Sequence, residues 1–129
     1  MVDTKIADLS AEDRIRGCLL GGAIGDALGA GIEFSSLPEL RDRFGPAGVI
    51  GYVPAYGRTG TITDDTQMTL FTAEALARTK DLADEEAVVD AVWIGYQQWL
   101  VTQGVDSQVP LPGTGGLIDE AVLHHRRAP

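Results

Sequence analysis

Four glycines, Gly17, Gly21, Gly25 and Gly29, recur every four residues in an otherwise apolar segment near the start of the chain. Ser10, with two acidic residues close behind it, has the features of a helix N-cap, so the glycines form a stripe along one predicted helix. Each glycine inside a helix costs roughly 1 kcal/mol relative to alanine, and the stripe therefore needs compensation. We interpret it as a surface for close helix–helix contact, with close approach of a ligand or a metal cluster as the alternative.

The rest of the chain predicts further helices separated by loops. These helices are expected at residues 34–43, 63–78, 84–100 and 116–125. Residues 44–62 are rich in glycine and proline and should form a loop, and a loop of that length in a small domain is often functional. Because no strand pair or internal repeat is evident in the sequence, the predicted fold class is all-α. Residues 1–10 are expected to be a flexible lead, and residues 11–129 to belong to one domain.

Periodic apolar residues in two of these helices should form buried faces. In the helix at residues 63–78 they are Met68, Phe71, Ala75 and Leu76. In the helix at residues 84–100 they are Val88, Val92, Trp93, Tyr96 and Trp99. Cys18 lies within the first predicted helix, has no histidine beside it in the sequence, and is also expected to belong to the core.

The composition is that of a soluble, acidic protein. Apolar residues make up 44% of the chain, and no apolar run approaches the roughly 18 residues that span a bilayer. The net charge of −9 disfavours binding along a nucleic-acid backbone, and the surplus of carboxylates suits a hard cation. A lone cysteine excludes an intrachain disulfide, and the N-terminus has no apolar leader, so we expect a cytoplasmic location.

The segment Thr63-Asp64-Asp65-Thr66 is the strongest local signal, and it has two interpretations. One is helix capping, because Asp64 and Gln67 fit a capping box and acids favour the positive end of a helix dipole. The other is a hard-cation site, since adjacent carboxylates and a hydroxyl are the oxygen ligands that Mg²⁺ or Mn²⁺ prefers. Both can hold at once, because a helix N-terminus also fixes the positions of its side chains.

Asp26 interrupts the apolar helix and is the second signal. A buried carboxylate needs hydrogen bonds or a cation, so Asp26 is either satisfied by the protein or close to a metal. Glu33 follows two helical turns later and would share the face of Asp26 if the helix continued that far. A solvated Glu33 at the helix end is the alternative. Paired acids near a metal are also what glycoside chemistry uses.

These two segments together resemble a known family. Residues 21–34, GGAIGDALGAGIEF, match the pattern G-x-x-x-G-D-x-x-G-x-x-x-E, and residues 63–68, TDDTQM, match T-D-D-T-x-M. Both patterns are motifs of the ADP-ribosylglycohydrolase family, and the branch that activates dinitrogenase reductase is the most similar. Either motif alone is a weak signal, whereas both in this order and at this spacing are more specific.

The resemblance implies a compact orthogonal bundle of helices with a binuclear Mg²⁺ or Mn²⁺ centre. Thr63, Asp64 and Asp65 match the family's first three metal ligands, and Glu33 matches a glutamate proposed to act in catalysis. The implied reaction is hydrolysis of the glycosidic bond that joins ADP-ribose to a side chain, commonly arginine. The expected binding partner is therefore an ADP-ribosylated protein or ADP-ribose itself, and no membrane or nucleic acid is expected.

Further positions have supporting roles under the same resemblance. Asp26 and Thr66 are expected to support the metal ligands, and Asp64 is also expected to contact the substrate. The family has a glycine-rich loop that cradles phosphate, and the nearest candidates here are Gly115 and Gly116. A plain loop that leads into the last predicted helix is the alternative for these two glycines.

The chain departs from the family in one respect. Family members are considerably longer, and the D-x-D-T motif that supplies their remaining metal ligands does not occur here. We therefore expect an N-terminal part of the domain, with at most half of the metal shell, that needs a second copy or the missing C-terminal half. The alternatives are a non-catalytic member that binds ADP-ribose or a protein, and an unrelated helical domain with capped helices.

Overall fold

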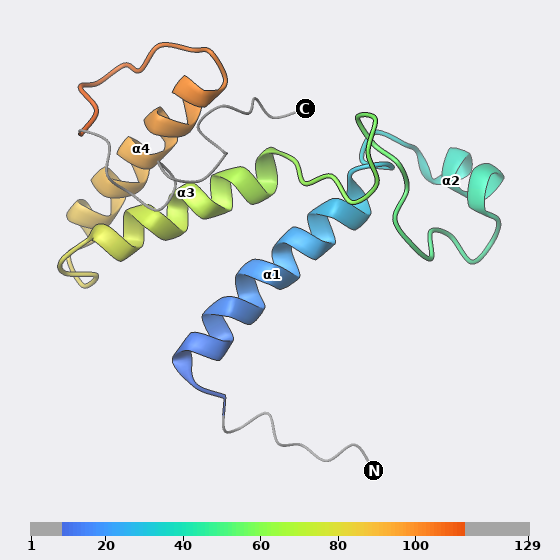
Figure 1. Cartoon of the computed structure of the whole chain (residues 1–129), viewed down its shortest axis with the longest axis horizontal. Helices are drawn as coiled ribbons and strands as arrows, with labels where there is room; N and C mark the ends of the chain where they lie inside the picture. The colour runs from blue at the N-terminus through green and yellow to red at the C-terminus, as the bar shows by residue number, and fades with distance from the viewer. Residues whose placement is uncertain (1–8, 113–129) are drawn as a thin grey trace. The chain divides into compact units, whose positions relative to one another are not determined.

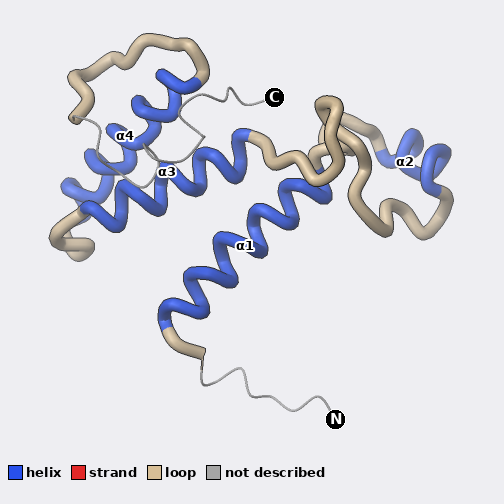
Figure 2. Tube along the Cα trace, in the orientation of Figure 1, coloured by secondary structure: helices blue, strands red, loops and turns tan. Residues whose placement is uncertain are grey.

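The computed structural model describes residues 9–112. Over that range it consists of helices joined by loops and has no strand longer than an isolated bridge (Figures 1 and 2). The helices are α1 (Ala11–Gly29), α2 (Leu37–Phe44), α3 (Asp64–Arg78) and α4 (Glu85–Thr102). The all-α prediction is confirmed, and each helix predicted within the described range is present. The helix predicted at residues 116–125 and most of the predicted lead lie outside the described residues. None of the described helices is long and apolar enough to cross a membrane.

The chain divides into two compact units, Met1–Thr61 and Ile62–Pro129. The first unit contains α1, α2 and the long loop that follows them. The second unit contains α3 and α4. The candidate site residues are therefore divided between the two units. The motif at residues 21–34 lies in the first unit, and the motif at residues 63–68 lies in the second.

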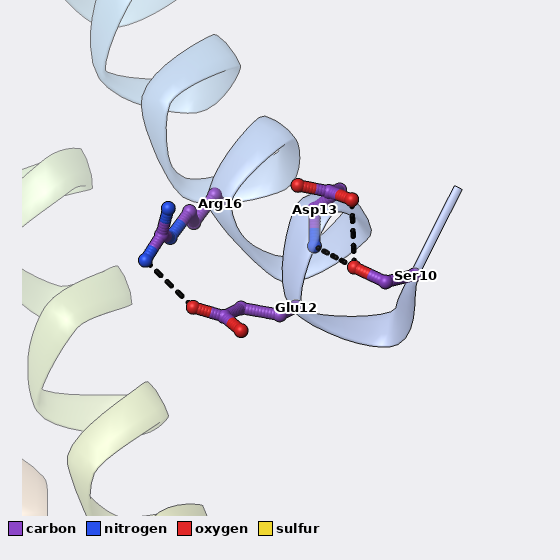
Figure 3. Close-up of polar contacts among 4 residues, drawn as sticks. All are labelled: Ser10, Glu12, Asp13 and Arg16. Atoms are coloured by element: carbon purple, nitrogen blue, oxygen red, sulfur yellow. Dashed lines mark hydrogen bonds and ion pairs between the residues drawn. The ribbon is translucent and has the colours of Figure 1, made fainter.

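Helix α1 begins at the residue that the sequence predicts. The Ser10 hydroxyl accepts a hydrogen bond from the Asp13 backbone N–H at 3.1 Å and donates to the Asp13 carboxylate at 2.7 Å (Figure 3). One turn further on, Arg16 pairs with Glu12 at 2.6 Å (Figure 3). This exposed i,i+4 ion pair stabilises the helix by about 0.3–0.5 kcal/mol. The N-cap satisfies one of the backbone N–H groups that the first turn leaves without a partner.

The glycine stripe of α1 is uncovered in the described part of the chain. A Cβ added at Gly17, Gly21, Gly25 or Gly29 would meet no described atom within 4 Å. Within the first unit, no described residue makes the close helix–helix contact predicted from the stripe. The core position predicted for Cys18 is wrong, because this residue is exposed.

After α1 the first unit continues as turns and a second capped helix. Helix α1 ends at Gly29, and i→i+3 hydrogen bonds then replace the helical pattern, as in Ile32 N–H to Gly29 O at 2.9 Å. At the start of α2, both the backbone N–H and the hydroxyl of Ser36 donate to the Glu39 carboxylate at 2.7 Å. These hydrogen bonds from Ser36, the side-chain one above all, hold the pKa of Glu39 below its usual value.

The loop at residues 44–62 contains one tight turn. Ala55 and Arg58 exchange both backbone hydrogen bonds, at 2.8 and 2.9 Å, and form an isolated β-bridge. The two central residues, Tyr56 and Gly57, both have positive φ, 50° and 78°. A turn of this kind suits glycine or asparagine, so the tyrosine is an unfavourable occupant. The Thr61 hydroxyl fastens the turn by donating to the Ala55 carbonyl at 3.2 Å.

In the second unit α3 and α4 form an antiparallel helical hairpin (Figure 1). The buried face of α3 includes Phe71 and Ala75, as predicted, and the close contact on α4 is made by Gly95. A second contact is the hydrogen bond from the Thr72 hydroxyl to the Tyr96 hydroxyl at 3.2 Å. Small residues at the crossing let the two helices approach closely.

The predicted core of α4 needs one correction. Trp93 was expected to be buried, but it is 47% exposed. A helix turns by about 100° per residue, so Trp93 lies about 200° from Gly95, which faces α3. Gln97 is the most buried side chain of the helix, and its amide oxygen accepts the Gln108 backbone N–H at 2.8 Å. A polar residue is tolerated there because that hydrogen bond satisfies it.

Candidate functional site

The candidate site is built around the start of α3, where Thr63 is the N-cap. Thr63 has an extended backbone and is only 4% exposed. Its hydroxyl oxygen accepts the Asp65 backbone N–H at 3.4 Å, and its carbonyl accepts the Gln67 backbone N–H at 3.3 Å. Capping is therefore performed by the threonine, and the capping box predicted between Asp64 and Gln67 is wrong.

The two carboxylates of the motif are left available by this arrangement. Asp64 is partly exposed and Asp65 is exposed, and both lie in the first turn of α3. Among the described residues, neither carboxylate accepts a side-chain hydrogen bond or forms an ion pair. They stand at the positive end of the helix dipole, which favours negative charge there. Thr66, which follows them, is buried and has an interaction partner.

The donor set fits part of a hard-cation site. Two carboxylates and one hydroxyl are oxygen ligands of the kind that Mg²⁺ and Mn²⁺ take. Mg²⁺ requires about six oxygen ligands, so water or further protein groups must supply the others. No group of three or more His, Cys, Asp or Glu side chains gathers within residues 9–112 to complete the set. The described residues therefore provide at most a partial shell.

Sequence reasoning missed the role of the Gln67 side chain. Gln67 is 5% exposed, and its amide oxygen accepts hydrogen bonds from Trp99 Nε1 at 3.1 Å and from Gln103 Nε2 at 3.3 Å. Both donors lie at the C-terminal end of α4. The first turn of α3 is therefore joined to the last turn of α4. The available signal was the short connection between the helices, which predicts an antiparallel pair and sets these ends side by side.

The first motif lies in the other unit. Helix α1 ends at Gly29, so the longer helix on which Asp26 and Glu33 would share a face is not formed, and the exposed Glu33 agrees with the alternative of a solvated side chain at the helix end. The cause is the change to i→i+3 turns after Gly29. Glu33 is exposed within these turns, whereas Asp26 is half-buried and has an interaction partner. Gly115 and Gly116, the predicted phosphate-loop candidates, lie outside the described residues.

The fold and the site define an all-helical protein with a partial hard-cation donor set at a helix start. A family model described as ADP-ribosylglycohydrolase matches residues 7–128, which is nearly the whole chain. The chain belongs to the ADP-ribosylglycohydrolase family.

Two curated relatives match parts of the chain. An ADP-ribosyl-(dinitrogen reductase) glycohydrolase of Rhodospirillum rubrum is 36% identical over 100 residues, covering 75% of this chain and 32% of the relative. An uncharacterized protein of Archaeoglobus fulgidus is 38% identical over 71 residues, covering 53% of this chain and 23% of the relative. The matches thus span a third or less of the relatives' length. A comparison with the solved structures found no significant match.

Proposed function

We propose that this chain contributes to a metal-dependent hydrolase that cleaves the glycosidic bond between ADP-ribose and a modified side chain, with arginine as the acceptor. The observation that carries the proposal is the family match together with the Asp64 and Asp65 carboxylates, which have no side-chain partner among the described residues and lie beside the buried Thr63. The Rhodospirillum rubrum relative is named for the removal of ADP-ribose from dinitrogen reductase, which supports a protein substrate. The activity belongs to the whole domain, of which this chain corresponds to a part.

Thr63, Asp64 and Asp65 are the proposed ligands of Mg²⁺ or Mn²⁺, within a binuclear centre in the complete site. A bound divalent cation would supply Lewis acidity and a water of lowered pKa. A small, strictly octahedral cation demands oxygen ligands in a fixed geometry, and these three are consecutive residues at the start of α3. Asp26 and Thr66 are proposed as supporting residues of this centre.

Glu33 is the proposed general acid/base. Cleavage at C1 of a ribose passes through an oxocarbenium-like transition state, and a carboxyl group that exchanges a proton with the leaving group or with water lowers its energy. Glu33 is exposed, so its carboxyl is open to a ligand that arrives from solvent. Asp64 is proposed to contact the ribose as well, and Gly115 and Gly116 are proposed to contact the phosphates through their backbone N–H groups.

The proposed setting is the cytoplasm, and the proposed partners are an ADP-ribosylated protein and the group that completes the metal shell. That group is a second copy of the chain or the C-terminal part of the family domain. Three protein oxygens leave about half of an octahedral shell to be filled, by water or by groups of such a partner. An acidic protein with a net charge of −9 would hold the anionic ADP-ribose through the cation rather than through basic side chains.

A second candidate function is a non-catalytic family member that binds ADP-ribose or a protein. The observation that favours it is the absence, within the described residues, of a third acid near Asp64 and Asp65. Such a protein would keep the fold while losing the chemistry.

The test is release of ADP-ribose from an arginine-ADP-ribosylated protein, measured with Mg²⁺ and with EDTA. The chain is assayed alone and after addition of the C-terminal part of the Rhodospirillum rubrum relative. Metal-dependent release that Asp64→Asn abolishes supports the hydrolase. Binding of ADP-ribose without release in both mixtures would favour the non-catalytic function.

A further inference from the structure

A buried contact joins the first turn of α3, which carries the proposed cation ligands, to the C-terminal end of α4. Gln67 reaches the site in two ways. Its backbone N–H donates to the Thr63 carbonyl at 3.3 Å and so closes the first turn of α3. Its side-chain oxygen accepts from Trp99 and Gln103, which fixes that same turn against α4. Thr63, Asp64 and Asp65 all lie within the turn that Gln67 closes.

The donors that hold Gln67 are well suited to fixing its position. An indole N–H can only donate, so Trp99 determines that the oxygen, and not the nitrogen, of the Gln67 amide faces α4. Gln103 also donates from the same nitrogen to the Thr102 hydroxyl at 2.7 Å, which holds its amide in turn. Gln67 is 5% exposed, so water competes little for these bonds.

The first turn of a helix is otherwise the part that frays most readily. The cap of α3 is weak by distance, since the Asp65 N–H lies 3.4 Å from the Thr63 hydroxyl. A cation site that needs three oxygens from this turn would be poorly formed if the turn opened and closed freely. Contacts that orient metal ligands from behind typically change metal affinity by about 10–100-fold when they are removed.

We propose that Gln67, braced by Trp99 and Gln103, is the positioning residue that preorganises Thr63, Asp64 and Asp65 for a divalent cation. This inference rests on the proposed function, because it takes these three residues to be metal ligands. Gln67 itself touches neither metal nor substrate. It acts through the turn that it closes, and the specific device is a side-chain hydrogen bond between the start of one helix and the end of the next.

The test uses amide hydrogen exchange by NMR on the full chain, with and without Mg²⁺. Gln67→Met keeps the length of the side chain and removes the acceptor, whereas Trp99→Phe keeps an aromatic ring and removes the donor. Both variants should speed exchange of the Asp65 and Gln67 amides by about tenfold. In both, the Mg²⁺ concentration needed to slow this exchange should be about tenfold higher than in the wild type. Tyr96→Phe is the matched control, since it removes a side-chain hydrogen bond between α3 and α4 in the middle of the hairpin.

A double variant separates positioning from stability. Replacing both partners by apolar groups leaves no buried donor or acceptor of this bond unpaired, so Gln67→Met with Trp99→Phe should recover much of the lost Tm. It should not recover the Mg²⁺ response, because the first turn of α3 still lacks its hydrogen bond to Trp99. If Tm and Mg²⁺ response recover together, or if the single variants respond to Mg²⁺ as the wild type does, the positioning role is overturned.

A separate result would identify a failure of the proposed function. Asp64→Asn should abolish the effect of Mg²⁺ on the exchange of the first-turn amides in the wild-type background. If Mg²⁺ has no effect that depends on Asp64, the start of α3 is not the cation site, and the positioning role is overturned with it. Faster first-turn exchange in Gln67→Met would then reflect helix capping alone.

Discussion

Gly95 of α4 lies against the main chain of Phe71 in α3, so that a Cβ added to Gly95 would stand 3.2 Å from the Phe71 carbonyl oxygen and 3.3 Å from the Ala75 Cβ. This is the closest approach of the two helices that the described glycines reveal. It explains why a glycine occupies the middle of a helix, where it would otherwise be unfavourable.

Enlarging Gly95 should therefore destabilise the second unit. Gly95→Val places two methyl groups where one Cβ is already tight, and the helices must separate to admit them. We expect a loss of about 1–3 kcal/mol in the free energy of unfolding, measured by urea denaturation. A variant as stable as the wild type would show that α3 and α4 do not pack as closely as described.

Gly17→Ala is the opposite case and tests the glycine stripe of α1. A Cβ at Gly17 meets no described atom within 4 Å. Alanine should then raise the free energy of unfolding of the chain by about 0.5–1 kcal/mol through helix propensity alone. Destabilisation by this change, in the same urea experiment, would mean that the stripe is a packing surface after all.

The tight turn at Ala55–Arg58 offers a further test. Tyr56 has φ of 50° in a turn whose central positions favour asparagine followed by glycine. Tyr56→Asn should stabilise the chain by up to about 1 kcal/mol, because asparagine adopts this conformation more readily. Thermal unfolding of the two proteins measures the difference. A fall in Tm would show that the tyrosine ring makes compensating contacts.

The capping of α2 predicts a dependence on pH. The Ser36 hydroxyl and backbone N–H lower the folded-state pKa of Glu39, so the stabilising contribution is present above the unfolded-state pKa. It is lost as the pH falls through the lower, folded-state pKa. Ser36→Ala removes the larger of the two causes and should move the pKa of Glu39 up towards its usual value.

An NMR titration of the Glu39 side chain checks this directly. Arg43 also lowers the pKa of Glu39, by a smaller charge effect, so a complete return to the usual value is not expected. The matched control is Ser10→Ala at the start of α1, which should leave the pKa of Glu39 unchanged. An unshifted pKa in Ser36→Ala would contradict the capping geometry of α2.

The helices were predictable because their signals are local. Ser10, Ser36 and Thr63 are polar residues placed just before apolar-periodic segments, and each is the N-cap of a helix in the structure. The antiparallel pairing of α3 and α4 also follows from their short connection. Local chemistry decides such features, so one sequence suffices to predict them.

The failures concern features that depend on what else packs nearby. Trp93 was placed in the core by its apolar character, but the face of α4 that meets α3 is the one that carries Gly95. Gln67 was assigned to a capping box from its spacing, whereas its side chain accepts a hydrogen bond from Trp99, thirty-two positions away. The shared face of Asp26 and Glu33 required α1 to continue beyond Gly29, where it ends.

The candidate site was found from its sequence motif. Thr63, Asp64 and Asp65 occupy the first turn of α3 as expected, with both carboxylates available. Their role as metal ligands stays a prediction, as does that of Glu33 in catalysis. The family model supports the assignment of the chain.

The most direct test of the central claim is a Mn²⁺ titration followed by the EPR signal of the free ion. The wild-type chain is compared with Asp64→Asn and with Asp90→Asn. Asp90 is an exposed acid on α4, and its substitution changes the net charge by the same amount as Asp64→Asn does. Asp64→Asn should lose most of the Mn²⁺ affinity of the wild type, and Asp90→Asn should retain it. Equal Mn²⁺ binding by all three proteins would contradict a cation site at the start of α3.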